Sequence, residues 1–417
     1  MDKFIINGGR KIFGEVTISG SKNAVLPIMA ATIIEPGIYT IKNVPILRDT
    51  VTMARLLEII GAKITFSDNQ LIIDSNNCNN PIAPYDLVKT MRASFYVLGP
   101  LLSRFNEATV SLPGGCAWGP RPVDFHLKAL KEMGAKVNLD YGNIVITGSL
   151  KGSNIKFKKI SVGATGNIIM AAVKADGITV IENASVEPEI INLVDFLNNI
   201  GADIKVFKDK NRYVVAGVDK LNCLSEYEVI PDRIEAGTYM IAVALIGGKI
   251  TINNIIPNHL QIVIDKMLDA GVMINVADQS LTIESSQPIK PVNITTSEYP
   301  GFPTDLQAQW MVLMTLAKGE SKITENIYKD RFTHIAELKR FGCIIRLEEN
   351  CAFITGVDKL KSAPVMSTDI RASASLVIAA LKAKGESEVS RIYHLDRGYE
   401  NIVDKFGQLG ANIKRVK

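Results

Sequence analysis

One pattern recurs six times along the 417 residues of this chain, and it limits the possible folds more than any other feature. Each copy reads as an amphipathic helix, a glycine, a small or apolar residue, and then two strands joined by a polar turn. A glycine in this place is typical of the left-handed residue that ends a helix. The repeated glycines stand about 70 residues apart, at Gly61, Gly134, Gly201, Gly271, Gly342 and Gly410.

A second landmark lies between these glycines. It is an almost wholly apolar helix that ends in a glycine and a short strand, as at Gly177–Ile181 and Gly248–Ile252. A helix that is apolar on every side is buried in a core. Each unit therefore contains a buried helix, a strand, an outer amphipathic helix and a hairpin. Six such units predict a repeated α/β fold.

The sixth unit is incomplete, because the chain ends after a single strand at 412–416. We expect Lys3–Asn7 to supply the missing strand, so that the two termini meet in one sheet. The predicted domains are then residues 22–229, with three units, and residues 1–21 together with 230–417, with the other three.

Composition narrows the class of protein. The net charge of +4 is too small to indicate nucleic acid or an anionic membrane as a partner. Five cysteines without a C-x-x-C pair and four histidines without metal-ligand spacing indicate a reducing compartment and no metal site. The N-terminus lacks the pattern of a signal peptide, and apolar stretches such as 239–246 are too short to span a bilayer. We expect a cytoplasmic protein with no cofactor, whose protein partners the sequence does not predict.

Basic residues stand at the starts of three buried helices, as Lys22, Arg92 and Arg371. The Ser, Thr, Asn and Asp residues beside them are explained by N-capping. A cation at a helix start opposes the helix dipole by roughly 0.3–1 kcal/mol, unless an anion binds there. We therefore expect the helix starts to gather on one side of each domain and to line a cleft for a polyanion. Capping alone is the alternative.

The segment 113–124, Pro-Gly-Gly-Cys-Ala-Trp-Gly-Pro-Arg-Pro-Val-Asp, places one thiol in a loop rich in glycine and proline. Glycines let backbone approach a ligand, and prolines stiffen the exit from the loop. A guanidinium such as Arg121 favours the thiolate of a nearby cysteine. Cys116 is therefore a candidate acid or nucleophile, with an incidental cysteine in a surface turn as the alternative.

These helix starts and the cysteine loop, together with Phe302–Asp305 and Asp396–Glu400, resemble the enolpyruvyl transferase family over essentially the whole chain and in matching order. The resemblance implies a two-domain inside-out α/β barrel built from six βαβαββ units, three in each domain. It implies transfer of the enolpyruvyl group of phosphoenolpyruvate to the 3-hydroxyl of UDP-N-acetylglucosamine, the first committed step of peptidoglycan synthesis. Shikimate 3-phosphate is an alternative acceptor, although the relatives that use it lack this cysteine loop. A catalytically silent paralogue that binds nucleotide sugar is a second alternative.

The resemblance also implies the substrate-binding residues. Phosphoenolpyruvate is expected at Lys22 and Asn23, with Arg121 and Arg397 as further cations. Asp369 and Arg371 are also predicted to bind substrate. The nucleotide sugar is expected to contact Arg92, Arg121, Pro122, Val123, Asp124, Phe125, Lys159, Ser161, Val162, Gly163, Asp305 and Ile327.

Four of the implied residues would take part in the chemistry. Cys116 would donate a proton to C3 of phosphoenolpyruvate, and it would also be able to form a covalent adduct and to react with the epoxide antibiotic fosfomycin. Asp305 is the expected base toward the sugar hydroxyl, and an N-capping role at its helix start is compatible with this. Lys22 and Arg397 would stabilise developing charge.

Two positions depart from the pattern of the relatives. Gly166 stands where many of them carry a larger residue, and the loop tip Ala117-Trp118 is unusual. Neither change removes a chemical group that the reaction needs, but both bear on loop dynamics or nucleotide affinity.

Overall fold

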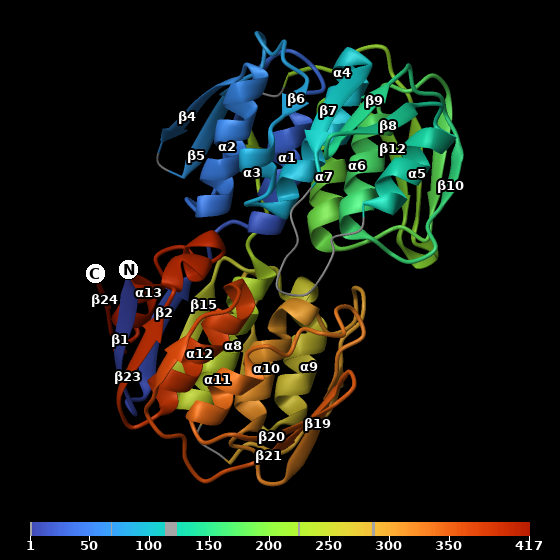
Figure 1. Ribbon diagram of the computed structural model, residues 1–417. Coiled ribbons are helices and arrows are strands. Elements are labelled where there is room, and N and C mark those ends of the chain that lie inside the picture. Colours follow the sequence, from blue (N-terminus) through green and yellow to red (C-terminus); the bar gives the residue numbers. More distant parts are fainter. Residues whose placement is uncertain (1, 68, 113–122, 224–225, 286–287) are drawn as a thin grey trace. The chain divides into compact units, whose positions relative to one another are not determined.

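The structure is a computed structural model that describes residues 2–67, 69–112, 123–223, 226–285 and 288–417. The chain divides into two compact units (Figure 1). The central unit comprises Gly20–Ile230, and the terminal unit comprises Met1–Ser19 together with Pro231–Lys417.

Six four-stranded sheets are present in the described parts of the chain, and all six have one strand pattern. A first strand runs parallel to the second, and the third and fourth places are taken by antiparallel strands. The sheets of the central unit are, in spatial order, β14 (Tyr227–Glu228), β3 (Ile38–Lys42), β5 (Gln70–Asp74) and β4 (Lys63–Ser67); β6 (Ile82–Ala83), β7 (Glu107–Ser111), β9 (Asn143–Thr147) and β8 (Lys136–Asp140); and β10 (Asn154–Lys156), β11 (Ile178–Glu182), β13 (Arg212–Ala216) and β12 (Asp203–Phe207).

The terminal unit repeats this pattern. Its sheets are β2 (Ile12–Thr17), β15 (Gly248–Asn253), β17 (Ser280–Ser285) and β16 (Met273–Val276); β18 (Ile294–Thr295), β19 (Glu320–Thr324), β21 (Cys351–Thr355) and β20 (Ile344–Glu348); and β22 (Pro364–Met366), β23 (Gly385–Ser390), β1 (Lys3–Gly8) and β24 (Asn412–Val416). The α/β fold of six repeated units is thereby confirmed.

The two chain ends share the last of these sheets. Strand β1 pairs antiparallel with β24, with Lys3 opposite Val416 and Asn7 opposite Asn412. Its other edge pairs with β23. Phe4 and Ile6 point into the core and are almost fully buried. The predicted pairing of the N-terminal strand with the incomplete sixth unit is therefore confirmed.

The helices that the sequence marks as apolar lie in the core of each unit. All residues of α8 and of α10 are buried. These two helices and α12 pack against one another inside the terminal unit (Figure 1). The helices of this unit are α8 (Arg233–Ile246), α9 (Gln261–Asp269), α10 (Gln307–Met314), α11 (Ile335–Arg340), α12 (Ile370–Lys382) and α13 (Ile402–Gln408), with 3₁₀ turns η3 (Pro257–Leu260), η4 (Thr304–Leu306) and η5 (Ile392–Arg397).

The central unit places its apolar helices in the same way, and α4 packs against α6. Gly99 of α4 allows this approach, because a Cβ there would lie 2.4 Å from the carbonyl oxygen of Asn167. The helices of this unit are α1 (Lys22–Ala31), α2 (Arg48–Ile60), α3 (Tyr85–Val88), α4 (Leu98–Phe105), α5 (Asp124–Glu132), α6 (Val162–Ala172) and α7 (Pro188–Asn199), with 3₁₀ turns η1 (Arg92–Val97) and η2 (Lys208–Lys210).

The six glycines that reveal the repeat share one backbone conformation. Their φ angles are all positive, from +86° at Gly271 to +112° at Gly61. At Gly61 the amide donates to the carbonyl of Leu57 and so closes the last turn of α2. Only glycine adopts this conformation without strain, which explains why the residue recurs at the end of each outer helix.

Among the helices of the described ranges, none combines the length and the apolar character needed to cross a membrane.

Candidate active site

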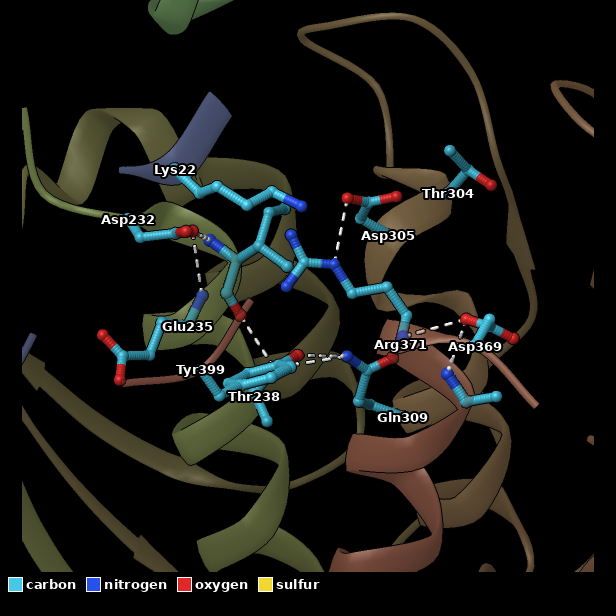
Figure 2. Close-up of polar contacts among 12 residues, drawn as sticks. Lys22, Asp232, Glu235, Thr238, Thr304, Asp305, Gln309, Asp369, Arg371 and Tyr399 are labelled. Carbon is cyan, nitrogen blue, oxygen red and sulfur yellow. Dashed lines mark hydrogen bonds and ion pairs between the residues drawn. The ribbon is translucent and has the colours of Figure 1, made fainter. Parts of the chain in front are cut away.

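The starts of two core helices meet in the terminal unit and place Asp305 beside Arg371. Asp305 lies in η4, directly before α10, and Arg371 lies in the first turn of α12. Because α10 and α12 pack together, the Nε of Arg371 lies 3.0 Å from Oδ2 of Asp305 (Figure 2). The other carboxylate oxygen, Oδ1, accepts a hydrogen bond of 2.8 Å from Nη1 of Arg331. Two guanidinium groups therefore fix the Asp305 carboxylate from both sides.

Carboxylates near the first turn of α12 compensate for the positive charge of Arg371. Asp369 is the N-cap, and its Oδ1 accepts from the backbone amides of Arg371 and Ala372 at 2.9 and 3.0 Å. The Arg371 side chain is only 4% exposed and forms an ion pair with Asp305. The carboxylates of Asp305 and Asp369 thus offset the unfavourable position of this cation at a helix start. Arg371 therefore has counter-charges within the protein at this helix start.

The structure does not give Asp305 the N-capping role that was considered beside its role as base. The N-cap position of η4 is Pro303, and the N-cap position of α10 is Leu306. Asp305 instead directs both oxygens to guanidinium groups from other segments. With 27% of its side chain exposed, this carboxylate is held firmly and is still reachable by a small polar group.

A buried polar network of Tyr399, Gln309 and Thr238 packs against the Arg371 side chain. Its guanidinium carbon lies 5.3 Å from the centre of the Tyr399 ring. The Tyr399 hydroxyl accepts from Nε2 of Gln309 at 3.1 Å and shares a hydrogen bond of 3.0 Å with Thr238 (Figure 2). Burial raises the pKa of Tyr399, although the charge of Arg371 opposes this, so the phenol remains neutral at physiological pH.

Two further predicted residues lie in the same unit. Ile327 follows β19 and is half-buried, and its backbone amide donates to Glu325 at 2.8 Å. Arg397 ends η5, two residues before Tyr399, and its side chain is also half-buried. Both therefore belong to segments that adjoin the Asp305–Arg371 cluster within this unit.

In the central unit, Lys22 begins α1 and is a buried cation. Its Nζ lies 3.4 Å from Oδ2 of Asp49 in the first turn of α2, and the two side chains are 10% and 6% exposed. The neighbouring Asn23 is half-buried. Asp49 was missed in the sequence, because a carboxylate in the first turn of a helix is a common structural choice and does not by itself indicate a site.

Three of the predicted nucleotide-sugar contacts of the central unit, Arg92, Val123 and Gly163, lie close enough to His126 to interact with it. Its ring meets Phe95 of η1 edge to face, with 5.0 Å between the ring centres. Its Nε2 packs so closely on Gly163 that a Cβ there would lie at 3.3 Å. Burial, helped by the charge of Arg92, lowers the pKa of His126 to about 3, so the imidazole is neutral.

This neutral imidazole joins three chain segments that the sequence predicts as nucleotide contacts. They are the 3₁₀ turn that begins at Arg92, the approach to α5 at 123–125, and the start of α6 at 161–163. Ser161 caps α6, because its hydroxyl accepts from the amide of Ala164 at 3.3 Å. Lys159 is exposed in the segment just before this cap.

The departure at Gly166 has a packing explanation. A Cβ at this position would lie 2.8 Å from Cε1 of Tyr96 and 3.3 Å from Cδ1 of Ile190. Tyr96 therefore occupies space that a larger residue at position 166 would need.

Cys116, Arg121, Pro122 and the loop tip lie outside the described residues, and their predicted roles remain predictions.

Comparison with known proteins agrees with the repeated architecture. The chain has the fold of the enolpyruvyl transferase NikO from Streptomyces tendae, with a TM-score of 0.91 and 24% identity over 100% of this chain and 99% of that one. EPSP synthase from Acinetobacter baumannii matches over 100% of both chains, with a TM-score of 0.78 and 19% identity.

Sequence similarity is much higher to a narrower group. The family model for EPSP synthase (3-phosphoshikimate 1-carboxyvinyltransferase) matches residues 6–406. UDP-N-acetylglucosamine 1-carboxyvinyltransferase from Trichlorobacter lovleyi is 52% identical, covering 100% of this chain and 99% of the relative. The protein of the same name from Chlorobium luteolum is 50% identical with the same coverage. The chain therefore belongs to the enolpyruvyl transferase family, and within it to the group formed by these carboxyvinyltransferases.

Proposed function

We propose that this chain transfers the enolpyruvyl group of phosphoenolpyruvate to the 3-hydroxyl of UDP-N-acetylglucosamine and releases phosphate. The choice of acceptor rests on sequence identity. About half of all residues, over the full length of the chain, are identical in transferases named for that acceptor. The reaction would commit the nucleotide sugar to peptidoglycan synthesis and so contribute to cell shape and division. We further propose that the two units act as the two three-repeat domains predicted from the sequence.

The first half of the reaction is an addition. C3 of phosphoenolpyruvate gains a proton, for which the Cys116 thiol is the proposed donor. The sugar O3 then forms a bond to C2 and loses its proton to the carboxylate of Asp305, which gives a tetrahedral ketal. A positioned acid or base of this kind typically contributes about 10²–10⁴-fold to the rate.

The second half is an elimination. A proton leaves C3, the bond from C2 to the phosphate oxygen breaks, and the double bond between C2 and C3 forms again. The products are the 3-O-enolpyruvyl ether and inorganic phosphate. Lys22, Asn23, Arg121 and Arg397 are proposed to hold the phosphate and carboxylate groups and to stabilise their charge as it shifts.

The surroundings of Asp305 favour its role as a hydroxyl acceptor. An ionised carboxylate has two oxygens with about four sites for hydrogen bonds. Arg331 and Arg371 each occupy one site on a different oxygen, at 2.8 and 3.0 Å. The two guanidinium groups hold the carboxylate in one orientation, from which it would accept the proton of the sugar hydroxyl.

The burial of Lys22 favours a strong interaction with the anionic substrate. Electrostatic attraction grows as the local dielectric falls, and the Lys22 side chain is only 10% exposed beside a buried Asp49. The proposed nucleotide-sugar contacts comprise Arg92, Lys159, Asp305 and Ile327 with the segments 121–125 and 161–163. Asp369 and Arg371 are further proposed substrate contacts.

Phosphate release tests the proposal. The purified chain is mixed with phosphoenolpyruvate and either UDP-N-acetylglucosamine or shikimate 3-phosphate, and free phosphate is measured. We expect phosphate to be released with UDP-N-acetylglucosamine as the acceptor and not with shikimate 3-phosphate. Release only with shikimate 3-phosphate would favour the alternative acceptor, and binding of nucleotide sugar without any release would favour a silent paralogue.

The role of Asp305 is tested by Asp305→Ala. We expect turnover to be abolished while calorimetry still detects binding of UDP-N-acetylglucosamine. Asp358→Ala, at an exposed position of the same unit, is the matched control and should leave turnover unchanged. Near-normal turnover of Asp305→Ala would refute the role of this residue as the base.

A further inference from the structure

Behind Asp305 lies a buried carboxylate that the proposed reaction does not use. We propose that Glu325, Thr304 and Arg331 form a positioning network that fixes Asp305 and the main chain at Ile327 relative to one another. The inference rests on the proposed function, because Asp305 and Ile327 are the two predicted contacts of the acceptor sugar that this network joins.

One oxygen of Glu325 organises the loop that follows β19. The Glu325 side chain is fully buried. Its Oε1 accepts from the backbone amides of Ile327 and Tyr328 at 2.8 and 2.9 Å. The same oxygen accepts from the hydroxyl of Thr296 at 2.8 Å. A carboxylate that accepts several hydrogen bonds in a buried place holds its donors in one geometry.

The other oxygen of Glu325 reaches toward Asp305 through two side chains. Oε2 accepts from the hydroxyl of Thr304 at 2.9 Å. The Thr304 oxygen in turn accepts from Nη1 of Arg331 at 2.9 Å. The same Nη1 donates to Oδ1 of Asp305 at 2.8 Å. Because a threonine hydroxyl has one proton, its donation to Glu325 leaves the oxygen free to accept from Arg331.

Charge therefore determines the direction of each hydrogen bond between Glu325, Thr304, Arg331 and Asp305. Glu325 accepts only, Arg331 donates only, and Thr304 stands between them as both donor and acceptor. The Arg331 side chain is 7% exposed, so its alignment is not weakened by solvent. Its guanidinium also lies over the ring of Tyr328, at 5.8 Å from the ring centre, which ties the arginine to the loop that Glu325 organises.

This arrangement does more than fill space. A buried carboxylate and a buried guanidinium are costly to desolvate, and an apolar pair of similar size would pack at least as well. What the polar chain adds is a fixed direction for the Asp305 oxygen that faces Arg331. A displacement of about 1 Å in a reacting group can lower the rate by about 10²-fold.

A matched pair of substitutions at Thr304 separates positioning from packing. Thr304→Val keeps the shape of the side chain and removes the hydroxyl, whereas Thr304→Ser keeps the hydroxyl and removes a methyl group. We expect kcat of Thr304→Val to fall about 10²-fold with an unchanged KM for phosphoenolpyruvate. Thr304→Ser should retain kcat within a few-fold of the wild type.

Substitution of Arg331 gives an independent test. Arg331→Lys keeps the charge but loses the planar fork, so it cannot contact Thr304 and Asp305 in the same way. We expect a loss of kcat similar to that of Thr304→Val. The control is Arg346→Lys on β20, because Arg346 is 57% exposed and forms a surface ion pair with Glu348. This control should keep full activity.

The outcomes distinguish this inference from the proposed function. Absence of phosphate release by the wild type would contradict the proposed function, and the affinity for UDP-N-acetylglucosamine would then be compared by calorimetry. In that case a Thr304→Val protein that binds about tenfold more weakly than Thr304→Ser would still support the network. The network is refuted if Thr304→Val and Thr304→Ser behave alike in both kcat and affinity.

Discussion

Replacing Lys405 with methionine should destabilise the terminal unit, because it leaves the buried carboxylate of Glu235 without its cation. Nζ of Lys405 lies 2.7 Å from Oε1 of Glu235, and the side chains are 14% and 3% exposed. The other oxygen of Glu235 accepts from the backbone amide of Ser19 at 2.8 Å. Methionine has a similar length and keeps most of the apolar packing of the lysine stem, so the change removes mainly the charge.

The distance and the burial set the size of the effect. At 2.7 Å and an effective dielectric of about 20, two unit charges attract by about 6 kcal/mol. Part of this is offset, because the lysine regains its hydration when the protein unfolds. Breaking a buried ion pair by removal of one partner typically costs about 3–5 kcal/mol. We therefore expect the free energy of unfolding of this unit to fall by about 3 kcal/mol near neutral pH.

The loss should depend on pH. Burial raises the pKa of Glu235 above its ordinary value of 4.5, and the nearby Asp232 adds to this, whereas Lys405 opposes the rise. Without Lys405 the pKa rises further. A carboxyl group whose pKa is raised in the folded state contributes stability below its ordinary pKa, and this contribution is lost as the pH rises through the folded-state value. The Lys405→Met protein should therefore be less impaired at pH 5 than at pH 7.5.

Fluorescence of Trp310, which is fully buried in α10, reports unfolding of the terminal unit. Urea titrations in a Trp118→Phe background leave Trp310 as the only tryptophan of the chain. Lys266→Met is the control, because its ion pair with Asp269 has side chains 30% and 58% exposed and should contribute less than about 0.5 kcal/mol. A loss below about 1 kcal/mol in Lys405→Met, or a loss that is the same at both pH values, would refute the reasoning.

Three further outcomes are expected. Fosfomycin should add its mass to the wild type but not to Cys116→Ser, and an unmodified thiol in the folded, substrate-saturated protein would count against the proposed role of Cys116. Gly166→Ala should lower the free energy of unfolding by about 1–3 kcal/mol, since its Cβ would meet Tyr96 at 2.8 Å; an unchanged urea midpoint would show that the ring moves aside. Asp49→Asn should lower kcat/KM for phosphoenolpyruvate by about tenfold while the affinity for nucleotide sugar is kept, because Lys22 loses the carboxylate that orients its ammonium group; equal losses for both substrates would indicate a general structural defect.

The fold could be predicted largely from the sequence because its signals are local. A glycine that directly follows an amphipathic helical pattern, such as Gly61 or Gly271, indicates the end of that helix. An apolar stretch such as α8 indicates a buried helix. Even the pairing of the two termini followed from counting strands in the sixth unit. The short leading strands were harder to place, because two-residue strands such as β6 and β14 have no periodic pattern to recognise.

The site was predicted less completely, because its supporting residues act through tertiary contacts. Lys22, Asp305 and Arg371 stood out as charged residues at helix starts. Glu325 and Arg331 stand in ordinary polar sequence, and only the fold brings them to Asp305. The same reason explains why an N-cap at Asp305 was a plausible alternative, since the helix start was visible in the sequence and the two arginines facing it were not.

His126 illustrates a signal that was present but weak. It directly follows the predicted contact Phe125, yet a single histidine on a helix is usually a core residue. Its role in joining the starts of η1 and α6 became visible from its contacts with Phe95 and Gly163.

The most direct test of the account is the reaction carried out in heavy water, with mass analysis of the nucleotide-sugar product. Addition followed by elimination passes through an intermediate in which C3 is a methyl group, so any of its hydrogens can be lost. We therefore predict that UDP-N-acetylglucosamine gains an enolpyruvyl group that carries deuterium at C3, with release of phosphate. A product without deuterium would contradict the addition–elimination mechanism, and the absence of any enolpyruvyl product from the folded protein would contradict the proposed function itself.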